Sequence, residues 1–482
     1  MSFFYDLTYN TTLAAQSLWD ASSRLVYPGI RLGITGLSRS GKTVFTTSLI
    51  HNLMNNGHLP AFHATIKNTI RRVKLSPQPD IAIPRFQFED YLHSLTRNRQ
   101  WPPSTERISE IRLDIEYQRI SGWSSAPGTL TLDIIDYPGE WLLDLTLLDE
   151  NFRSWSHKTV GSAHLPDKKE ISQPWLEVLS QTSPDEPVDE AKASQLSIAF
   201  KNYLKALRSG PETVATTPPG RFLMPGDLDG SPALTFSPLI LKSDQPINTD
   251  SMAGLMEQRF EAYKNHIIKP FFRNHFQRID RQIVLIDILA ALDAGPAAVT
   301  ELESAIDNVL LAFRIGKRSL FSNLFAPRAD KILFAATKAD HLHHENHNRL
   351  NAILRLLVSR AIRRSEAAGA EVGTIALSSV RATHEKTVRD QGDVLKAVSG
   401  IPEAGEKVGG QTFDGLGEAI IFPGDLPENP EDIFKGAIFP GSLRFPRFRP
   451  PHFPTDLPEN ALVIPHIRLD RALEFLIGDY LA

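Results

Sequence analysis

The 482-residue sequence contains no cysteine. This absence excludes disulfide bridges, thiolate zinc sites, iron–sulfur ligation and cysteine nucleophiles, so any chemistry must use other side chains. Long hydrophobic runs are missing as well. The most apolar stretch, residues 283–292, contains Asp287 and is too short to cross a bilayer. We expect a buried strand there and no transmembrane segment.

Neither sign of charge is in large excess. The chain has 52 Lys and Arg against 56 Asp and Glu, a formal net charge of −4. No long-range field therefore draws the whole molecule to nucleic acid or to an anionic membrane, although a local peripheral membrane contact stays open. We expect no nucleic-acid partner. The first residues lack a basic stretch followed by an apolar run and a cleavage site, so we expect a cytoplasmic protein.

A phosphate-binding loop is the first motif present. A short apolar strand is predicted at residues 30–35, and a helix is predicted to run to about residue 56. Between them, GLSRSGKT matches GxxxxGK[ST], in which backbone N–H groups surround phosphates. Lys42 is expected to reach the β- and γ-oxygens, and the Thr43 hydroxyl is expected to bind Mg²⁺. The expected nucleotide contacts are Gly36, Ser38, Arg39, Ser40, Gly41, Lys42, Thr43 and Val44.

The next two predicted strands, residues 108–118 and 129–135, are joined by a short connection rich in Ser, Gly and Pro. Parallel neighbours would need a crossover of a dozen or more residues, so we expect an antiparallel pair. Such a pair beside a P-loop strand favours a Ras-like GTPase over kinases and most ATPases. The predicted fold is therefore an α/β, Ras-like P-loop NTPase core whose mixed sheet contains one antiparallel strand.

Composition and periodicity divide the chain into four parts. We expect the first part of the GTPase core at residues 1–150, a mainly helical insertion at 151–280, the second part of the core at 281–390, and a hairpin-rich C-terminal extension with a closing helix at 391–482. A short leading helix is expected at residues 8–25. Later in the chain we expect a strand at 282–289, a helix at 344–367 and the closing helix at 468–481. The insertion has two readings, a stabilising elaboration or a module for an unidentified protein effector or for self-assembly.

The sequence Asp136-Tyr137-Pro138-Gly139 follows an apolar strand and fits the DxxG of a GTPase switch II. Asp136 is expected to hold Mg²⁺ through water, while the Gly139 amide senses the γ-phosphate. Glu140 comes next, where many GTPases carry the glutamine that orients the attacking water. We therefore expect slow intrinsic turnover, or water positioned by another group.

Two further catalytic candidates come from less specific patterns. Thr105 is our choice for the switch I threonine that closes on Mg²⁺, in competition with Ser104 and Thr65. Arg39 lies inside the P-loop. It could act as an internal arginine finger, with a solvent-facing or switch-packing role as the alternative.

Thr337-Lys338-Ala339-Asp340 resembles the guanine-reading [NT]KxD. The Asp340 carboxylate can accept from guanine N1–H and the N2 amino group together, whereas adenine offers no such donor pair. The Lys338 stem would lie along the base. Thr337 replaces the usual Asn, which puts a bridging bond to the P-loop in doubt. Ser379 ends the next predicted strand, where a GTPase loop contacts the guanine oxygen through its backbone, or where an ordinary polar turn would lie.

Histidines gather directly after this motif, at positions 341, 343, 344 and 347. The spacing of His343 and His347 suits one metal ion on a helix, but it is not HExxH, and a solvated helix start is the more typical interpretation. Residues 444–450 alternate basic residues with aromatic residues and prolines. We expect them to be an edge segment packed on the domain.

Together, GLSRSGKT, WPPST, DYPGEW and TKAD resemble the YcjX-like family of bacterial P-loop GTPases, and the resemblance covers most of the chain. It implies a Ras-like core with a helical insertion, GTP and GDP binding, GTPase activity and an association with stress responses. The function we expect is Mg²⁺-dependent hydrolysis of GTP to GDP by a molecular switch. Two alternatives remain: a nucleotide-dependent scaffold with little hydrolysis, and an ATP-using P-loop ATPase or kinase.

Overall fold

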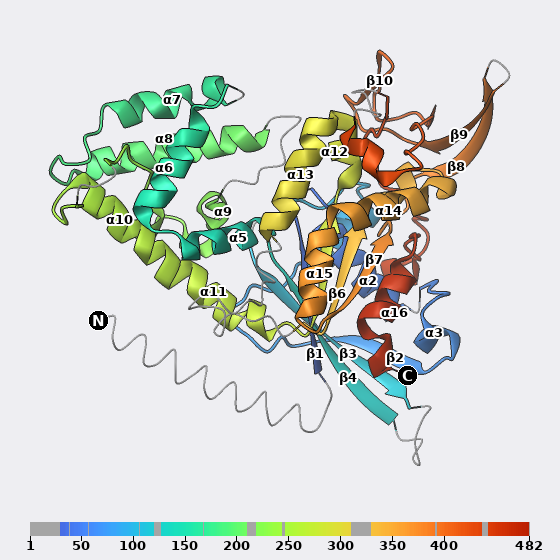
Figure 1. Cartoon of the computed structure of the whole chain (residues 1–482). Coiled ribbons are helices and arrows are strands. Elements are labelled where there is room, and N and C mark those ends of the chain that lie inside the picture. Colours follow the sequence, from blue (N-terminus) through green and yellow to red (C-terminus); the bar gives the residue numbers. More distant parts are fainter. Residues whose placement is uncertain are drawn as a thin grey trace.

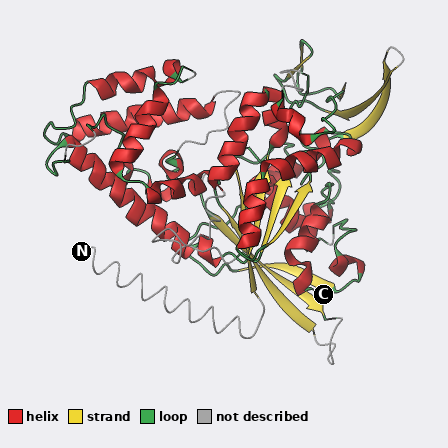
Figure 2. Cartoon of the chain, viewed as in Figure 1, coloured by secondary structure: helices red, strands yellow, loops and turns green. Residues whose placement is uncertain are grey.

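The computed structural model describes residues 29–37, 39–55, 57–105, 107–119, 127–166, 168–209, 218–242, 246–309, 329–390, 393–435 and 442–481. The leading helix expected at residues 8–25 and Ser38 lie outside these ranges. A central sheet is covered by helices on both faces, and a largely helical region stands to one side (Figure 1 and Figure 2). Among the described helices, none is long and apolar enough to cross a membrane.

Seven strands form the central sheet in the order β2-β3-β4-β1-β5-β6-β7. In chain order they are β1 (Gly29–Gly36), β2 (Ile70–Ser76), β3 (Ser109–Gln118), β4 (Pro127–Asp136), β5 (Arg281–Ile286), β6 (Lys331–Ala336) and β7 (Glu371–Ala376). β3 is antiparallel to β2 and β4, and every other neighbouring pair is parallel. The mixed sheet with one reversed strand is therefore present as predicted.

The β3–β4 pair places two site elements side by side. Its register runs without interruption from Ser109 opposite Asp136 to Gln118 opposite Pro127. The antiparallel pairing predicted from the short connection is confirmed. Because β3 starts beside the end of β4, the segment that leads into β3 is carried to the Asp136 end of the sheet.

Strand β2 was not predicted. Its sequence, IRRVKLS, buries only two of its seven side chains fully. β2 lies at the edge of the sheet and pairs only with β3. A strand with one neighbour can present charged residues to water, so it lacks the apolar run that marks a central strand.

Helices cover the two faces of the sheet with separate hydrophobic clusters. One face carries α2 (Lys42–Met54), α4 (Phe88–Thr96) and α16 (Leu469–Ile477), whose buried residues pack with those of β1 and β4. The other face carries α13 (Pro296–Val309), α14 (His347–Leu357) and α15 (Ser359–Ala367). Figure 1 shows these helices on either side of the strands. This is the doubly wound arrangement that the alternating pattern predicts.

Some element ends differ from the prediction. The strand expected at 282–289 ends at Ile286 because the Asp287 side chain accepts from Ala290 N and caps α12 (Ile288–Ala294). The helix expected at 344–367 is two helices, since α14 ends before Val358 and α15 begins after it. The closing helix expected at 468–481 is α16 followed by a short 3-10 turn, Gly478–Tyr480.

The range 151–280 is largely helical. It contains α6 (Phe152–Ala163), α7 (Lys169–Ser180), α8 (Glu190–Ser209), α9 (Gly220–Leu223), α10 (Met252–Tyr263) and α11 (Lys269–Asn274), with a π-helical turn, Lys264–Ile268, joining the last two. Aromatic rings fill its interior, for example Trp155 stacked on Phe260 at 4.8 Å. This core is continuous with the cluster under α13 and α14. The region therefore folds onto the sheet, and its bounds as a domain stay a prediction.

The C-terminal extension begins with a three-stranded sheet of β8 (His384–Asp390), β9 (Asp393–Gly400) and β12 (Ala419–Ile421). The strands β10 (Lys407–Val408) and β11 (Gln411–Thr412) make a small hairpin. Asp390 pairs with Asp393, so the division predicted at residue 390 falls inside the β8–β9 hairpin. From there the chain returns across the core to α16.

Candidate functional site

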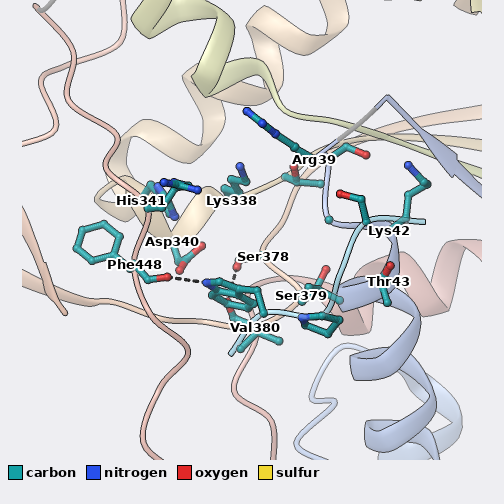
Figure 3. Close-up of a pocket in the computed structure, with 18 of the residues that line it drawn as sticks. Arg39, Lys42, Thr43, Lys338, Asp340, His341, Ser378, Ser379, Val380 and Phe448 are labelled. Atoms are coloured by element: carbon teal, nitrogen blue, oxygen red, sulfur yellow. Dashed lines mark hydrogen bonds between the residues drawn. The ribbon is translucent and has the colours of Figure 1, made fainter. Parts of the chain in front are cut away.

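A cavity of about 390 Å³ opens at the carboxyl ends of the parallel strands. Ligands of open α/β sheets bind in this position. The cavity is lined by Arg39, Ser40, Gly41, Lys42, Thr43, Val44, Trp101, Pro102, Pro103, Ser104, Thr105, Thr337, Lys338, Asp340, His341, Ser378, Ser379, Val380, Glu403, Arg447 and Phe448. In Figure 3, Lys42 and Thr43 lie at one side of it, and Asp340 and Phe448 lie at the other.

The P-loop crosses the end of β1 and turns into α2. Arg39 (φ 64°) and Gly41 (φ 87°) both adopt the left-handed region that this tight turn requires. The Lys42 ammonium donates to the Gly36 carbonyl at 2.9 Å, so it lies across the loop. Arg39 is exposed at the cavity edge. Gly36 itself is packed below the cavity, where a Cβ would lie 2.3 Å from the Leu285 carbonyl oxygen.

The three residues predicted to bind Mg²⁺ form one hydrogen-bonded chain. The Thr105 hydroxyl donates to Asp136 Oδ2 at 3.0 Å, and the Thr43 hydroxyl lies 3.1 Å from the Thr105 hydroxyl. Thr43 also donates to the Pro103 carbonyl at 3.2 Å. The structure thus brings Thr105 to Thr43 and Asp136. Thr65, by contrast, belongs to α3 (His63–Ile66), which contacts Glu474 of α16.

These residues suit a small hard cation. Asp136 is 2% exposed, and its Oδ1 has no hydrogen-bond partner in the described part of the chain. Burial raises the pKa of Asp136 to about 6, whereas the Lys42 charge and the Thr105 hydrogen bond lower it. Two hydroxyls and a carboxylate are oxygen ligands of the kind that Mg²⁺ prefers. A buried carboxylate with a spare oxygen therefore fits the implied ion.

Gly139 of the DxxG motif lies directly against the P-loop. A Cβ on Gly139 would be 2.4 Å from the Gly36 carbonyl oxygen, so this contact requires glycine. Glu140 begins α5 (Glu140–Leu143), is 3% exposed, and does not belong to the described residues that line the cavity. Its backbone carbonyl instead lies against Gly220 of the insertion.

The insertion contacts the helical segment that follows the DxxG motif. The sequence did not indicate this contact. The buried Asp144 carboxylate accepts from the backbone N–H groups of Gly220 and Arg221 and from the Tyr263 hydroxyl at 2.6 Å. The Arg221 guanidinium lies over the Trp141 ring at 4.1 Å. Asp144 belongs to no recognisable sequence motif, because its hydrogen-bond partners lie 76 or more positions away in the sequence.

At the other end of the cavity lies the [NT]KxD-like loop. Asp340 is 4% exposed, and its Oδ2 accepts from Ala382 N at 2.9 Å. Lys338 (φ 60°) extends its ammonium to Asp287. The Thr337 hydroxyl donates to Ile286 O at 3.4 Å, within the sheet and not to the P-loop. The Asn bridge that was in doubt therefore has no counterpart at Thr337 in this structure.

Ser379 lies beside the P-loop helix. Its carbonyl accepts from the Ser48 hydroxyl of α2 at 2.6 Å, which ties the two loops together. Both Ser378 and Ser379 line the cavity. Ser379 therefore lies in the same cavity as Asp340, and its contact with a base stays a prediction.

The sequence did not reveal the wall formed by Trp101, Glu403, Arg447 and Phe448. The WPPST motif was noted without a role for Trp101, and residues 444–450 were expected only to pack on the domain. Phe448 is indeed packed, at 2% exposure, and its ring lies edge-on to His341 at 5.2 Å. The surprise is that the packed segment also faces the cavity.

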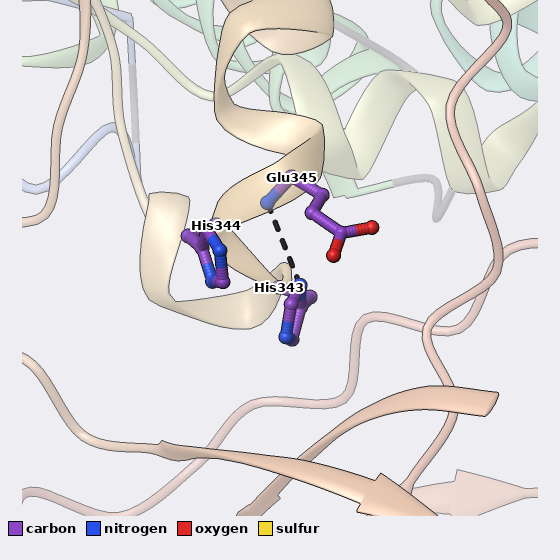
Figure 4. Close-up of side chains that lie close together, drawn as sticks. All are labelled: His343, His344 and Glu345. Atoms are coloured by element: carbon purple, nitrogen blue, oxygen red, sulfur yellow. Dashed lines mark hydrogen bonds between the residues drawn. The ribbon is translucent and has the colours of Figure 1, made fainter. Parts of the chain in front are cut away.

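The histidine cluster has a different arrangement from the one considered. His343 precedes a 3-10 turn, His344–Asn346, and α14 begins only at His347, so helical spacing does not join His343 to His347. His347 is buried and bonds the Ala339 carbonyl at 2.8 Å. Figure 4 shows His343, His344 and Glu345 together. These groups already have protein partners, since Glu385 bonds the His344 ring at 2.7 Å and Lys396 pairs with Glu345 at 2.9 Å.

Comparison with known proteins identifies the family of this chain. The model of the YcjX-like family, DUF463, matches residues 30–481. A protein of Escherichia coli (strain K12) named Ras-like GTPase YcjX is 35% identical over 471 residues, which cover 94% of this chain and 96% of the relative. A protein of the same name from Shewanella oneidensis is 31% identical over 477 residues, 94% of each chain. The chain therefore belongs to the YcjX-like family.

Proposed function

We propose that this chain binds GTP together with Mg²⁺ and hydrolyses it to GDP as a Ras-like switch. One observation carries the proposal: Thr43 and Thr105, which are hydrogen-bonded to each other and through Thr105 to Asp136, line the same cavity as the buried Asp340. Thr43 and Asp340 lie at opposite ends of this cavity in Figure 3. The names of the two relatives, Ras-like GTPase, support the same activity. A nucleotide needs one end of its site to bind phosphates and a metal ion, and the other end to bind the edge of the purine. The cavity offers both.

At the phosphate end, the backbone N–H groups from Ser40 to Val44 and the positive end of α2 would hold the phosphate oxygens. Lys42 would exchange its bond with the Gly36 carbonyl for β- and γ-oxygens. Thr43, Thr105 and Asp136 would hold Mg²⁺, which supplies charge neutralisation at the phosphates when bound. The Thr105 hydroxyl would then turn from Asp136 toward the nucleotide side.

At the base end, Asp340 gives the preference for guanine. Its carboxylate is buried with one oxygen bonded to Ala382 N, which fixes its direction. Guanine offers two donors to the remaining lone pairs, whereas adenine would leave the carboxylate without them at a free-energy cost of about 1–3 kcal/mol. The Lys338 stem lies beside this position, oriented by Asp287.

Loss of the γ-phosphate would release Thr105 and Gly139. Because Gly139 leads directly into α5, and the insertion grips Asp144 just after α5, a change at Gly139 would reach the insertion. We place the contact with a protein effector on residues 151–280 for this reason. The association with stress responses rests on the family resemblance alone.

Slow intrinsic turnover is part of the proposal. Glu140 is buried beside the insertion, and Arg39 is exposed at the cavity edge. Neither side chain is placed in this state to orient a water molecule, so a conformational change or a partner must complete the site. The same observation supports the second candidate, a nucleotide-dependent scaffold with little hydrolysis.

The test is competition for a fluorescent GDP analogue, followed by measurement of phosphate release. We expect GTP and GDP to displace the analogue and ATP to fail, with Mg²⁺-dependent phosphate release that Lys42→Ala abolishes by preventing binding. Displacement by ATP in preference to GTP would refute the guanine assignment. Guanine binding without phosphate release, with and without cell extract, would favour the scaffold.

A further inference from the structure

One wall of the cavity comes from the C-terminal extension. Phe448 and Arg447 reach it from a segment that pairs with residues 401–403: Arg449 N donates to Ile401 O at 2.7 Å, and Glu403 N donates to Arg447 O at 2.8 Å. The Phe448 ring is buried and meets His341, the residue after Asp340. The wall therefore abuts the loop that reads the base.

Trp101 connects this wall to the segment that carries Thr105. Its indole N–H donates to the Phe448 carbonyl at 2.7 Å, the bond drawn as a dashed line from Phe448 in Figure 3. The Trp101 ring packs against two hydrophobic clusters, the main one around α2 and the small one around Phe448. Trp101 thus contacts both the GTPase core and the extension.

Neighbouring side chains add to the same attachment. The Arg99 guanidinium donates twice to the Pro450 carbonyl, at 3.1 and 3.2 Å. Arg97 donates to the Pro454 carbonyl at 3.1 Å and also to the Leu457 carbonyl. The segment before switch I, residues 97–101, is therefore hydrogen-bonded to the extension at several points.

The link from Trp101 to Thr105 is short and stiff. Only Pro102, Pro103 and Ser104 separate the two residues, and consecutive prolines favour an extended backbone with little freedom. At ~3.1 Å per residue, the link spans about 12 Å. A fixed Trp101 therefore limits how far Thr105 can move from Thr43 and Asp136.

We propose that the C-terminal extension holds the nucleotide site, with Phe448 closing the base end and Trp101 restraining switch I, so that both are positioning residues. This inference rests on the proposed function. It adds that nucleotide binding and docking of the extension stabilise each other, by the reciprocity of linked equilibria. It also assigns different effects to the two residues, because Trp101 acts through Thr105 and Phe448 acts beside Asp340.

The experiment compares three variants of the full chain. Trp101→Phe keeps a ring but removes the N–H donor, and Phe448→Leu shrinks the wall. Phe453→Leu is the matched control, because Phe453 is a buried residue of the same extension that does not line the cavity. Dissociation constants are measured for GDP and for a non-hydrolysable GTP analogue, each with Mg²⁺ and with EDTA, together with melting temperatures.

We expect Trp101→Phe to weaken the GTP analogue with Mg²⁺ about three- to tenfold, the range for one lost hydrogen bond, and to leave GDP in EDTA unchanged. Phe448→Leu should weaken both nucleotides alike, with or without Mg²⁺. Phe453→Leu should lower only the melting temperature. A merely structural role would lower the melting temperature in all three variants without any Mg²⁺-dependent change in affinity.

Gly400→Ala provides a second route to the same ring. A Cβ on Gly400 would lie 2.8 Å from Phe448 Cδ1, so the variant displaces Phe448 from outside the cavity and should reproduce Phe448→Leu. The inference would be overturned if Gly400→Ala had wild-type affinities and wild-type Mg²⁺ dependence, and if the same held for each of Trp101→Phe and Phe448→Leu that folds. Failure of the wild-type chain itself to bind either guanine nucleotide would instead overturn the proposed function.

Discussion

Gly220 of the insertion packs against the backbone of Glu140, so closely that a Cβ on Gly220 would lie 2.0 Å from the Glu140 carbonyl oxygen. This contact joins the residue after the DxxG motif to a helix 80 positions further along the chain. It is held in place by Asp144, which accepts from Gly220 N and Arg221 N. The insertion and the segment after the DxxG motif therefore touch backbone to backbone.

The first prediction concerns this contact. Gly220→Ala should lower the free energy of unfolding by ~1–3 kcal/mol, because an added methyl overpacks a backbone carbonyl that cannot move aside. Urea denaturation measures the change. Gly161→Ala is the control: Gly161 is an exposed residue of α6 with nothing within 4 Å of its Cβ, and it should be neutral or stabilising by up to ~1 kcal/mol. Equal effects of the two changes would contradict the contact.

The second prediction tests the choice of Thr105 over Ser104. Thr105→Val keeps the shape and removes the hydroxyl that donates to Asp136 at 3.0 Å. We expect a roughly tenfold loss of affinity for a GTP analogue in Mg²⁺, because a proposed oxygen ligand of the ion is removed, and little loss in EDTA. Ser104→Ala, which alters an exposed residue of the same cavity, should leave the affinity unchanged. The reverse result would transfer the role to Ser104.

The third prediction is a pH dependence centred on Asp136. Burial raises the pKa of Asp136 in the folded protein to about 6, above the 3.8 that is usual for an aspartate. Between these two values the folded protein keeps a proton that the unfolded chain has released, so the free energy of unfolding falls as the pH rises through this window. Above pH 6 the loss is complete, and it is on the order of 1–3 kcal/mol.

Asp136→Asn lacks this titrating group. The pH effects of the other carboxyl groups cancel when the wild type and the variant are compared. Urea denaturation in EDTA between pH 4 and pH 7.5 should show the wild type losing stability relative to Asp136→Asn as the pH rises. Mg²⁺ with nucleotide should also bind the wild type less tightly below pH 6, where the carboxyl group is protonated. A stability difference that does not vary with pH would show that Asp136 is ionised throughout.

The fourth prediction concerns base selection. Asp340→Asn replaces an acceptor oxygen with an amide donor, so it should move the preference from guanine toward xanthine nucleotides, whose edge offers an acceptor there. Competition of GDP and xanthosine diphosphate for the same labelled nucleotide measures the change. Asp293→Asn, at a partly buried aspartate of α12 that does not line the cavity, is the control. Unchanged guanine preference in Asp340→Asn would move the base elsewhere.

Much of the core could be predicted from local sequence. β1, β5 and β6 are short, mainly apolar runs because both of their faces are buried, and β1 and β6 each precede a recognisable loop. The β3–β4 pairing followed from the length of one connection. β2 was not predicted, because an edge strand needs few apolar residues. Helix ends were less certain, as at Asp287, where a side-chain cap decides the boundary.

The site was predictable where a motif is contiguous and not where residues meet across the fold. The P-loop, Asp136 and Asp340 each stand in a local pattern with a physical reason for its spacing. Thr105 was chosen over Ser104 and Thr65 without a decisive local signal, since the choice depends on which hydroxyl reaches Asp136. The Trp101–Phe448 bond joins residues 347 positions apart, and no local periodicity could have indicated it.

The added strand β2 determines where another chain could extend this sheet. On one side β3 pairs with β4 along its whole length, and on the other side it pairs with β2 from Arg112 to Tyr117. Nearer Thr105, Glu110 exchanges backbone hydrogen bonds with Pro84 and Phe86, so this end of β3 is covered as well. In the described residues the sheet ends at β2 and β7, and β2 carries Arg71, Arg72 and Lys74. A partner of the proposed GTP-bound state would therefore have to recognise side chains and loops, because the backbone edge of β3 near Thr105 is already hydrogen-bonded.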